Sequence, residues 1–321
     1  MPKTRRLGRT ALQVSELSLG TYMLTGDFAV PRDEADRIFD AAIDAGINYM
    51  DTAAMYGYGE SEELVGRALA RHPRRTLYVS TKVGVLDRTI VRHLGAAAYH
   101  DETALLRAIK HSLWLLRRDT VEVLMIHEPH MAEWGFDYKT GEAPVMRVLE
   151  TLKAQGVIGA IGVGIWLCDL VADLIETGRI DVALVAGGYT IVRQPVRDRV
   201  IPAAKRHDVG LVMGGTFLQG RLAENRRAHY QEVQRAANYN YFDDATAVTR
   251  YLAAYDLSDA CGISLTDLAI RYILADPDVH TMVPGAQTAA QVEQNLRAAQ
   301  AGPLPPDLTA RIAEISRLHS S

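Results

Sequence analysis

The sequence predicts an α/β fold, a single (β/α)8 TIM barrel domain spanning residues 1–321, with long loops at the C-terminal face. Three observations indicate it. Short apolar runs alternate with helical segments eight times, the first run lacks a dinucleotide-binding glycine pattern, and three segments after strands are too long for turns. About 250 residues or more in one unit is usual for such a barrel.

The predicted strands are short runs rich in apolar and β-branched residues. Several are almost continuously apolar, which is typical of parallel strands covered by helices on both faces. They lie at 12–20, 46–51, 76–82, 121–127, 157–164, 181–188, 209–215 and 279–285.

The segments between these runs have the periodicity of amphipathic helices. Apolar residues recur at helical spacing within 35–43, 106–116 and 145–152, with charged residues on the other face of the first segment. Ser264 and Thr288 are predicted to cap the N-termini of two later helices.

Strand–helix alternation alone also permits a doubly wound open sheet. A Rossmann domain of that kind needs G-x-G-x-x-G directly after its first strand, where this chain reads GTYMLTG (20–26). The mismatch favours the closed barrel.

Composition is that of an ordinary globular chain, with 48% hydrophobic and 23% charged residues and a formal charge of −4. Basic and acidic residues are mixed along the chain, which argues against nucleic-acid binding. Cys168 and Cys261 lie far apart, and there is neither an apolar run of about 18 residues nor a signal-peptide pattern. We therefore expect a cytoplasmic protein with no membrane contact, its oligomeric state left open and a homo-oligomer included.

The three long segments are 84–101, 128–143 and 218–262. In a barrel they rise from the C-terminal face, where active sites form. The segment 128–143 carries Trp134, Phe136 and Tyr138. These aromatic side chains either line a substrate pocket or form a lid that packs on itself, and the sequence leaves both interpretations open.

Polar residues end consecutive predicted strands. Asp51 ends the second, Lys82 the third and His127 the fourth, and Tyr56 follows Asp51 on its loop. Taken singly, each fits a structural ion pair or a core histidine. Three neighbouring strands that end this way on the catalytic face favour a shared chemical role.

These four residue types suit proton transfer at an oxygen. A tyrosine with a pKa near 10 is a poor acid or base at neutral pH. A nearby lysine ammonium favours the phenolate, and an aspartate holds the lysine in place. A histidine on the other side can hydrogen-bond the substrate oxygen while the tyrosine transfers a proton as hydride moves.

The segments that carry these residues resemble the aldo-keto reductase family. The likeness covers about residues 5–300 and rests on NYMDTAAMYGYGESEELVGRAL (48–69), TLYVSTKVG (76–84) and SLWLLRRDTVEVLMIHEP (112–129). It implies an (α/β)8 barrel with the catalytic set Asp51, Tyr56, Lys82 and His127. It also implies NAD(P)-dependent interconversion of a carbonyl or lactone with an alcohol or hemiacetal, on a sugar or a small aldehyde or alcohol, with Tyr56 as acid/base.

The resemblance also implies ligand contacts. GGTFLQG (214–220) is similar to the family's pyrophosphate segment, and PGAQTAAQVEQN (284–295) to its adenosine segment. The implied cofactor contacts are Gly20, Thr21, Asp51, Gly164, Gly215, Thr216, Phe217, Leu218, Gly220, Pro284, Gly285, Ala286, Gln287, Gln291, Gln294 and Asn295. The implied substrate contacts are Tyr22, Tyr56, His127 and Trp134. No metal is expected, because Pro129 disfavours a helical pair of His127 and His130.

The ends of two predicted strands depart from the family. Gly164 and Ile165 stand where a Ser-Asn pair usually holds the nicotinamide carboxamide, and Ala186-Gly187 replaces a common glutamine. LVAGGYTIV (184–192) is similar to the same stretch of the D-threo-aldose (L-fucose) 1-dehydrogenase branch and its pyridoxal-oxidising relatives.

Cofactor choice follows from charge. A 2′-phosphate needs a cationic cradle, and no cation lies between Pro284 and Arg297. NAD(H) is therefore slightly favoured over NADP(H), unless Arg221, Arg226 or Arg227 reaches over from its loop. The alternative function is a non-catalytic, nucleotide-binding regulatory barrel subunit; substrate and direction of reaction remain open.

Overall fold

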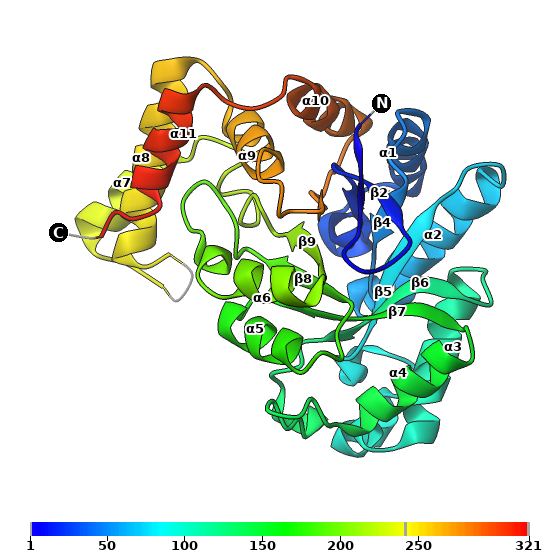
Figure 1. The fold of residues 1–321 in the computed structure, drawn as a ribbon. Coiled ribbons are helices and arrows are strands. Elements are labelled where there is room, and N and C mark those ends of the chain that lie inside the picture. The colour runs from blue at the N-terminus through cyan, green and yellow to red at the C-terminus, as the bar shows by residue number, and fades with distance from the viewer. Residues whose placement is uncertain (1, 241–242, 320–321) are drawn as a thin grey trace.

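Eight parallel strands form a nearly closed barrel, which confirms the predicted fold class (Figure 1). The structure is a computed structural model and describes residues 2–240 and 243–319. Sequential strands are neighbours throughout, and the first and last meet through bridges between Leu17 and Met282 and between Gly20 and Gly285.

The barrel strands overlap the eight predicted runs. They are β3 (Leu19–Gly20), β4 (Tyr49–Asp51), β5 (Tyr78–Val83), β6 (Val121–His127), β7 (Ile158–Ile165), β8 (Val182–Ala186), β9 (Gly210–Gly214) and β10 (Thr281–Met282).

The first predicted strand, 12–20, is wrong as a single element. Its start forms β2 (Gln13–Ser15), which pairs antiparallel with β1 (Thr4–Arg6), and only its end enters the barrel as β3. Leu7 and Val14, which belong to this hairpin, are buried among inward-facing barrel side chains such as Val123 and Val212. The first half of this apolar run therefore packs against the inner face of the barrel, and its second half completes the barrel sheet.

Helices alternate with the strands and cover the outside of the barrel. Those that follow barrel strands are α1 (Arg32–Asp44), α2 (Glu60–Arg71), α3 (Glu102–Leu115), α4 (Pro144–Ala154), α5 (Cys168–Glu176), α6 (Val200–His207), α9 (Leu265–Leu274) and α10 (Ala289–Gln300). The side chains of Ser264 and Thr288 accept hydrogen bonds from backbone N–H groups at the starts of α9 and α10, as predicted.

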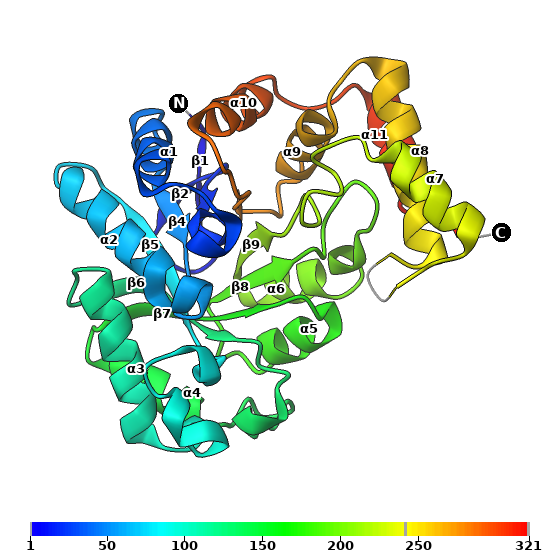
Figure 2. The same ribbon diagram turned by 180° about the vertical axis from the view of Figure 1, so that it is seen from behind.

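Three further helices stand together at one side of the barrel (Figures 1 and 2). They are α7 (Arg227–Ala236), α8 (Ala245–Cys261) and α11 (Pro306–Ile315). The first two come from the predicted long segment 218–262. Within the described ranges, no helix has both the length and the apolarity that crossing a membrane would require.

The barrel core follows the two-residue period of β-strands. Val123 and Met125 of β6 belong to the inner cluster, whereas Leu124 and Ile126 between them pack against the helices. This alternation fills the barrel interior and decides which residue of each strand faces inward where the strand ends.

Barrel closure depends on a close backbone contact at Gly20. Its N–H donates to the carbonyl of Pro284 at 3.0 Å, and a Cβ atom at Gly20 would lie 2.6 Å from the carbonyl oxygen of Val283. Because that neighbour is backbone, a side chain at Gly20 must push β3 away from the segment after β10.

We expect Gly20→Ala to lower the free energy of unfolding by about 1–3 kcal/mol, the usual range for overpacking. Urea denaturation measures this. Gly26→Ala is the matched control, since a Cβ there would meet its nearest atom at an ordinary 3.5 Å. Equal stability of the two variants would contradict the close contact.

Candidate active site

The stagger of the strands brings three polar side chains to the barrel mouth. In register, Asp51 lies beside Ser80, Lys82 beside Met125 and His127 beside Gly164. Lys82 therefore lies two positions beyond Ser80, the partner of Asp51, and His127 lies two positions beyond Met125, the partner of Lys82. With a side-chain period of two, Asp51, Lys82 and His127 continue the inward-facing rows above the apolar core.

The ammonium of Lys82 connects the group. Its Nζ lies 2.7 Å from Oδ2 of Asp51, 2.8 Å from the carbonyl oxygen of Thr52 and 3.2 Å from the Tyr56 hydroxyl. The Ser80 hydroxyl donates to the other carboxylate oxygen of Asp51 at 2.7 Å. Lys82 thus donates to three oxygens, and the phenolic hydrogen of Tyr56 remains available to another acceptor.

Tyr56 is placed by a tight turn after β4. The 3-10 turn Tyr56–Gly59 leads into α2 and contains left-handed backbone at Gly57 (φ 57°) and Tyr58 (φ 55°). The Tyr56 ring meets Tyr22 edge-on at 4.9 Å between centroids and His127 at 5.8 Å. These two aromatic rings fix the direction of the phenol.

Burial and nearby charges shift the pKa values of Lys82 and Tyr56 in opposite directions. Burial alone would lower the pKa of Lys82, but the Asp51 carboxylate and the Tyr56 hydroxyl together outweigh it and raise that pKa. For Tyr56, burial raises the pKa, and the lowering by Lys82 does not compensate. The expected effect of Lys82 is present, yet the phenol remains protonated at neutral pH.

His127 is neutral in this site. Burial, aided by the positive charge of Lys82, lowers the pKa of its imidazole well below the usual value. Its Nδ1 is buried and has no hydrogen-bond partner within the described chain. A neutral imidazole has one N–H to donate, which suits a hydrogen bond to a substrate oxygen.

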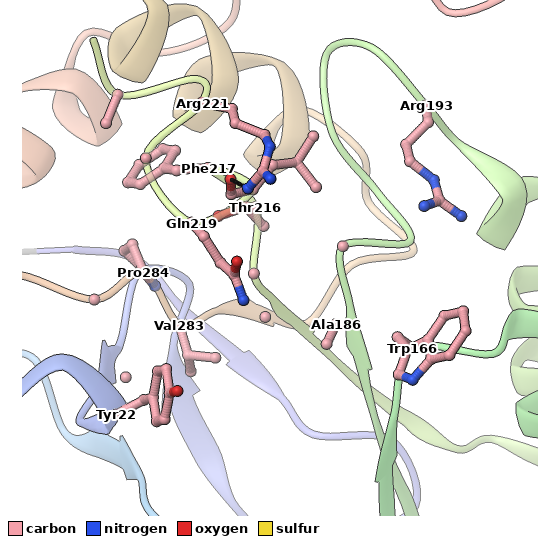
Figure 3. Close-up of a pocket in the computed structure, with 18 of the residues that line it drawn as sticks. Tyr22, Trp166, Ala186, Arg193, Thr216, Phe217, Gln219, Arg221, Val283 and Pro284 are labelled. Atoms are coloured by element: carbon pink, nitrogen blue, oxygen red, sulfur yellow. Dashed lines mark hydrogen bonds between the residues drawn. The ribbon is translucent and has the colours of Figure 1, made fainter. Parts of the chain in front are cut away.

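These side chains open into a cavity of about 1630 Å³ at the barrel mouth. Figure 3 shows Tyr22 and Pro284 on one side of it, Trp166 and Arg193 on the other, and the loop with Thr216 and Phe217 above. All the cofactor and substrate positions named from the sequence line this cavity except Trp134. Their individual roles stay predictions.

Trp134 lies in the protein interior rather than in the cavity lining. The side chain is fully buried, its indole N–H donates to the carbonyl of His127 at 3.1 Å, and its ring meets Tyr99 edge-on at 4.6 Å. Two of the long segments thus pack on each other here. Trp134 therefore does not line the cavity, and its indole supports the strand end that carries His127.

The cavity has features that fit a dinucleotide. The Thr216 hydroxyl is buried with no hydrogen-bond partner in the described residues, and it lies on the loop after β9. Gly215 (φ 60°) and Gly220 (φ 89°) give this loop left-handed turns, and a Cβ at Gly215 would lie 3.0 Å from the backbone nitrogen of Gly187. A polar, close-fitting backbone loop of this kind suits a phosphate group.

The adenosine segment is neutral, and nearby arginines are engaged. Gln291 accepts a hydrogen bond from the N–H of Gln287 at 2.7 Å. Arg221 pairs with both oxygens of Asp243, at 2.5 and 3.0 Å. Arg226 lines the cavity 3.6 Å from Glu224, whereas Arg227 pairs with Asp259 outside the lining.

Several lining residues were missed by the sequence reasoning. Glu128, Trp166 and Arg193 all border the cavity, and Arg193 comes from the loop after β8, which is shorter than the three segments singled out. The position of Trp166 directly after Ile165 was the available signal for its place at a strand end. Among the described residues, no group of three or more His, Cys, Asp or Glu side chains is arranged to hold a metal ion.

Comparison with known proteins gives the family. The model of the aldo/keto reductase family matches residues 16–317, so this chain belongs to that family. It is 30% identical to the D-threo-aldose 1-dehydrogenase of a Pseudomonas species, over 89% of each chain. It is 29% identical to the pyridoxal 4-dehydrogenase of Microbacterium luteolum, over 91% of each chain. This places it among oxidoreductases.

A solved structure supports the fold. The aldo-keto reductase AKR11C1 from Bacillus halodurans, in its holo form, superposes with a TM-score of 0.71 at 24% identity. The match covers 99% of this chain and 98% of that one. This likeness confirms the predicted barrel, as the family match confirms the predicted family.

We expect Lys82→Met to lower the free energy of unfolding by about 3–5 kcal/mol, because the buried Asp51 carboxylate loses its cationic partner. Urea denaturation measures this loss. The double variant Asp51→Asn/Lys82→Met should recover most of it, since no buried charge is then unpaired. A double variant as unstable as the single one would mean that Lys82 matters through packing instead.

Proposed function

We propose that this protein is an NAD(P)-dependent oxidoreductase that interconverts a carbonyl or lactone with an alcohol or hemiacetal. The observation that carries the proposal is the hydrogen bond between Lys82 and the Tyr56 hydroxyl at the base of the cavity, with Asp51 behind it and His127 beside it. A bound nicotinamide supplies or accepts the hydride.

The protein's own residues handle the proton. In reduction, the protonated Tyr56 donates its proton to the oxygen that becomes an alkoxide, and the neutral His127 donates a hydrogen bond to the same oxygen. The Lys82 ammonium stabilises the phenolate that remains. In oxidation the order reverses, and Tyr56 must first lose its proton, so that direction gains rate as pH rises.

The substrate class is proposed from the relatives and the cavity. The two enzymes reported above are named for oxidation of an aldose and of pyridoxal. We propose a sugar or a small aldehyde or alcohol, held between the catalytic set and the side of the cavity with Trp166. Both cysteines are free, which supports a reducing cytoplasm as the compartment.

An NAD(H) preference is supported by charge. The segment Pro284–Asn295 offers amides but no cation, and Arg221 is already bound to Asp243. Arg226 is the remaining source of positive charge from its loop. A purely regulatory nucleotide-binding barrel makes no use of a lysine-bound tyrosine, so the catalytic interpretation is favoured.

Replacement of Tyr56 by phenylalanine tests the acid/base assignment. We expect Tyr56→Phe to lower kcat by roughly 10²–10⁴ in either direction, because the proton carrier is lost while the ring remains. Nucleotide dissociation constants should stay within about twofold. Tyr58→Phe, on the same turn but 56% exposed, is the control and should retain full activity. Near-normal turnover by Tyr56→Phe would refute the role.

Dissociation constants for NADH and NADPH test the cofactor preference. We expect NADH to bind at least as tightly as NADPH, and Gln291→Arg to shift the ratio toward NADPH because a guanidinium pairs with phosphate. A tenfold preference for NADPH in the unmodified protein, about 1.4 kcal/mol, would contradict the idea. Loss of that preference in Arg226→Ala would then identify the loop arginine as its source.

A further inference from the structure

Glu128 has an unusual backbone at the end of β6. It directly follows His127, and its N–H donates to the carbonyl of Gly164 at 3.0 Å, so it still pairs with the neighbouring strand. Its φ angle is +51°, in the left-handed region. That conformation costs a non-glycine residue roughly 1 kcal/mol or more.

This backbone turn changes where the side chain goes. In a regular strand, successive side chains point to opposite faces, so a residue after the inward-facing His127 would point outward, toward the helices. The left-handed conformation at Glu128 breaks that alternation. As a result, His127 and Glu128 both line the cavity although they are adjacent in the chain.

The Glu128 carboxyl group is held but incompletely satisfied. Its Oε2 is buried and lies 3.1 Å from Nδ1 of His130, in an orientation that makes no hydrogen bond within the described residues. The side chain remains 26% exposed, and Glu128 lines the cavity. The His130 ring in turn meets Trp166 edge-on at 6.2 Å. The Oε2 atom thus lies against His130, while the exposed part of the carboxyl group can reach a ligand in the cavity.

The surroundings bring the pKa of the Glu128 carboxyl close to neutral pH. Burial raises the pKa of Glu128 to about 7, and the positive charge of Lys82 on β5 partly offsets the rise. The other titratable groups around it are His127, which is neutral, and His130 on its own loop. Above pH 7 the group is a charged hydrogen-bond acceptor at the rim of the catalytic set.

We propose that Glu128 is a specificity-determining residue that accepts a hydrogen bond from a substrate hydroxyl close to the reacting carbon. The inference rests on the proposed function, because it takes His127 as the group that contacts the reacting oxygen. A carboxylate one residue away then meets a hydroxyl on a nearby carbon. The class of substrate favoured is one with such a hydroxyl, compared with an otherwise identical molecule that lacks it.

Matched substrates separate this inference from the function itself. D-glyceraldehyde and propanal differ by two hydroxyls for reduction, and D-xylose and tetrahydropyran-2-ol differ by three for oxidation. The measured quantity is the ratio of kcat/KM for the hydroxylated substrate to that for its plain partner, at pH 8. We expect Glu128→Ala to lower this ratio about tenfold or more, the size of a lost charged hydrogen bond.

Four further variants separate the proposed role of Glu128 from structural effects. Glu133→Ala, an exposed glutamate on the same loop, should leave the ratio unchanged. Glu128→Gly relieves the strain of the left-handed backbone, so its melting temperature should not fall below that of the unmodified protein. Its kcat/KM ratio should still fall as in Glu128→Ala. Glu128→Gln should abolish the fall in the ratio that we expect below about pH 7, where the carboxylate becomes protonated. His130→Asn should retain that fall.

The outcomes are distinct. Turnover of both members of a pair with a ratio that Glu128→Ala leaves unchanged would overturn the role of Glu128 and leave the oxidoreductase function intact. A pH dependence that disappears in His130→Asn but persists in Glu128→Gln would also overturn it. Absence of turnover with all four substrates and both nucleotides would count against the proposed function, and the inference would fall with it.

Discussion

The ion pair between Lys82 and Asp51 is the interaction on which the mouth of the barrel depends. An ammonium group with only 1% of its side chain exposed is tolerated because a carboxylate, a carbonyl and a phenol surround it. Gly164 belongs to the same arrangement, since a Cβ there would lie 3.2 Å from Cδ and Cε of Lys82. Gly164, one of the residues that differ from the pattern implied by the family resemblance, thus also leaves room for the lysine chain.

That pairing sets the charge of the whole site. Asp51 helps to keep Lys82 charged, burial leaves Tyr56 protonated, and burial together with the positive charge of Lys82 leaves His127 uncharged. The site therefore presents two neutral hydrogen-bond donors to an incoming oxygen, with a buried cation one bond further back. In the proposed reaction, this arrangement stabilises negative charge on the oxygen with no reorganisation of charged groups.

Sequence reasoning succeeded where a periodic rule applies. The alternation of strands and helices was enough to predict the barrel, and the polar ends of three consecutive strands were enough to group Asp51, Lys82 and His127. It failed where a single backbone angle or a tertiary partner decides. Trp134 is buried because the segment 84–101 packs over it, and Glu128 faces the cavity because its φ is positive. Neither property has a signature in residue types alone.

The hairpin at the start of the chain has a consequence for biosynthesis. The guanidinium of Arg5 donates hydrogen bonds to the carbonyls of Leu274 and Asp276, and the N–H of Gly20 donates to the carbonyl of Pro284. The first strands of the chain therefore find their partners in segments close to its C-terminus. During translation, the open edge of β3 must wait until more than 260 further residues have left the ribosome. The nascent chain carries an unpaired strand edge for that whole interval, and such an edge can pair with other chains until the barrel closes.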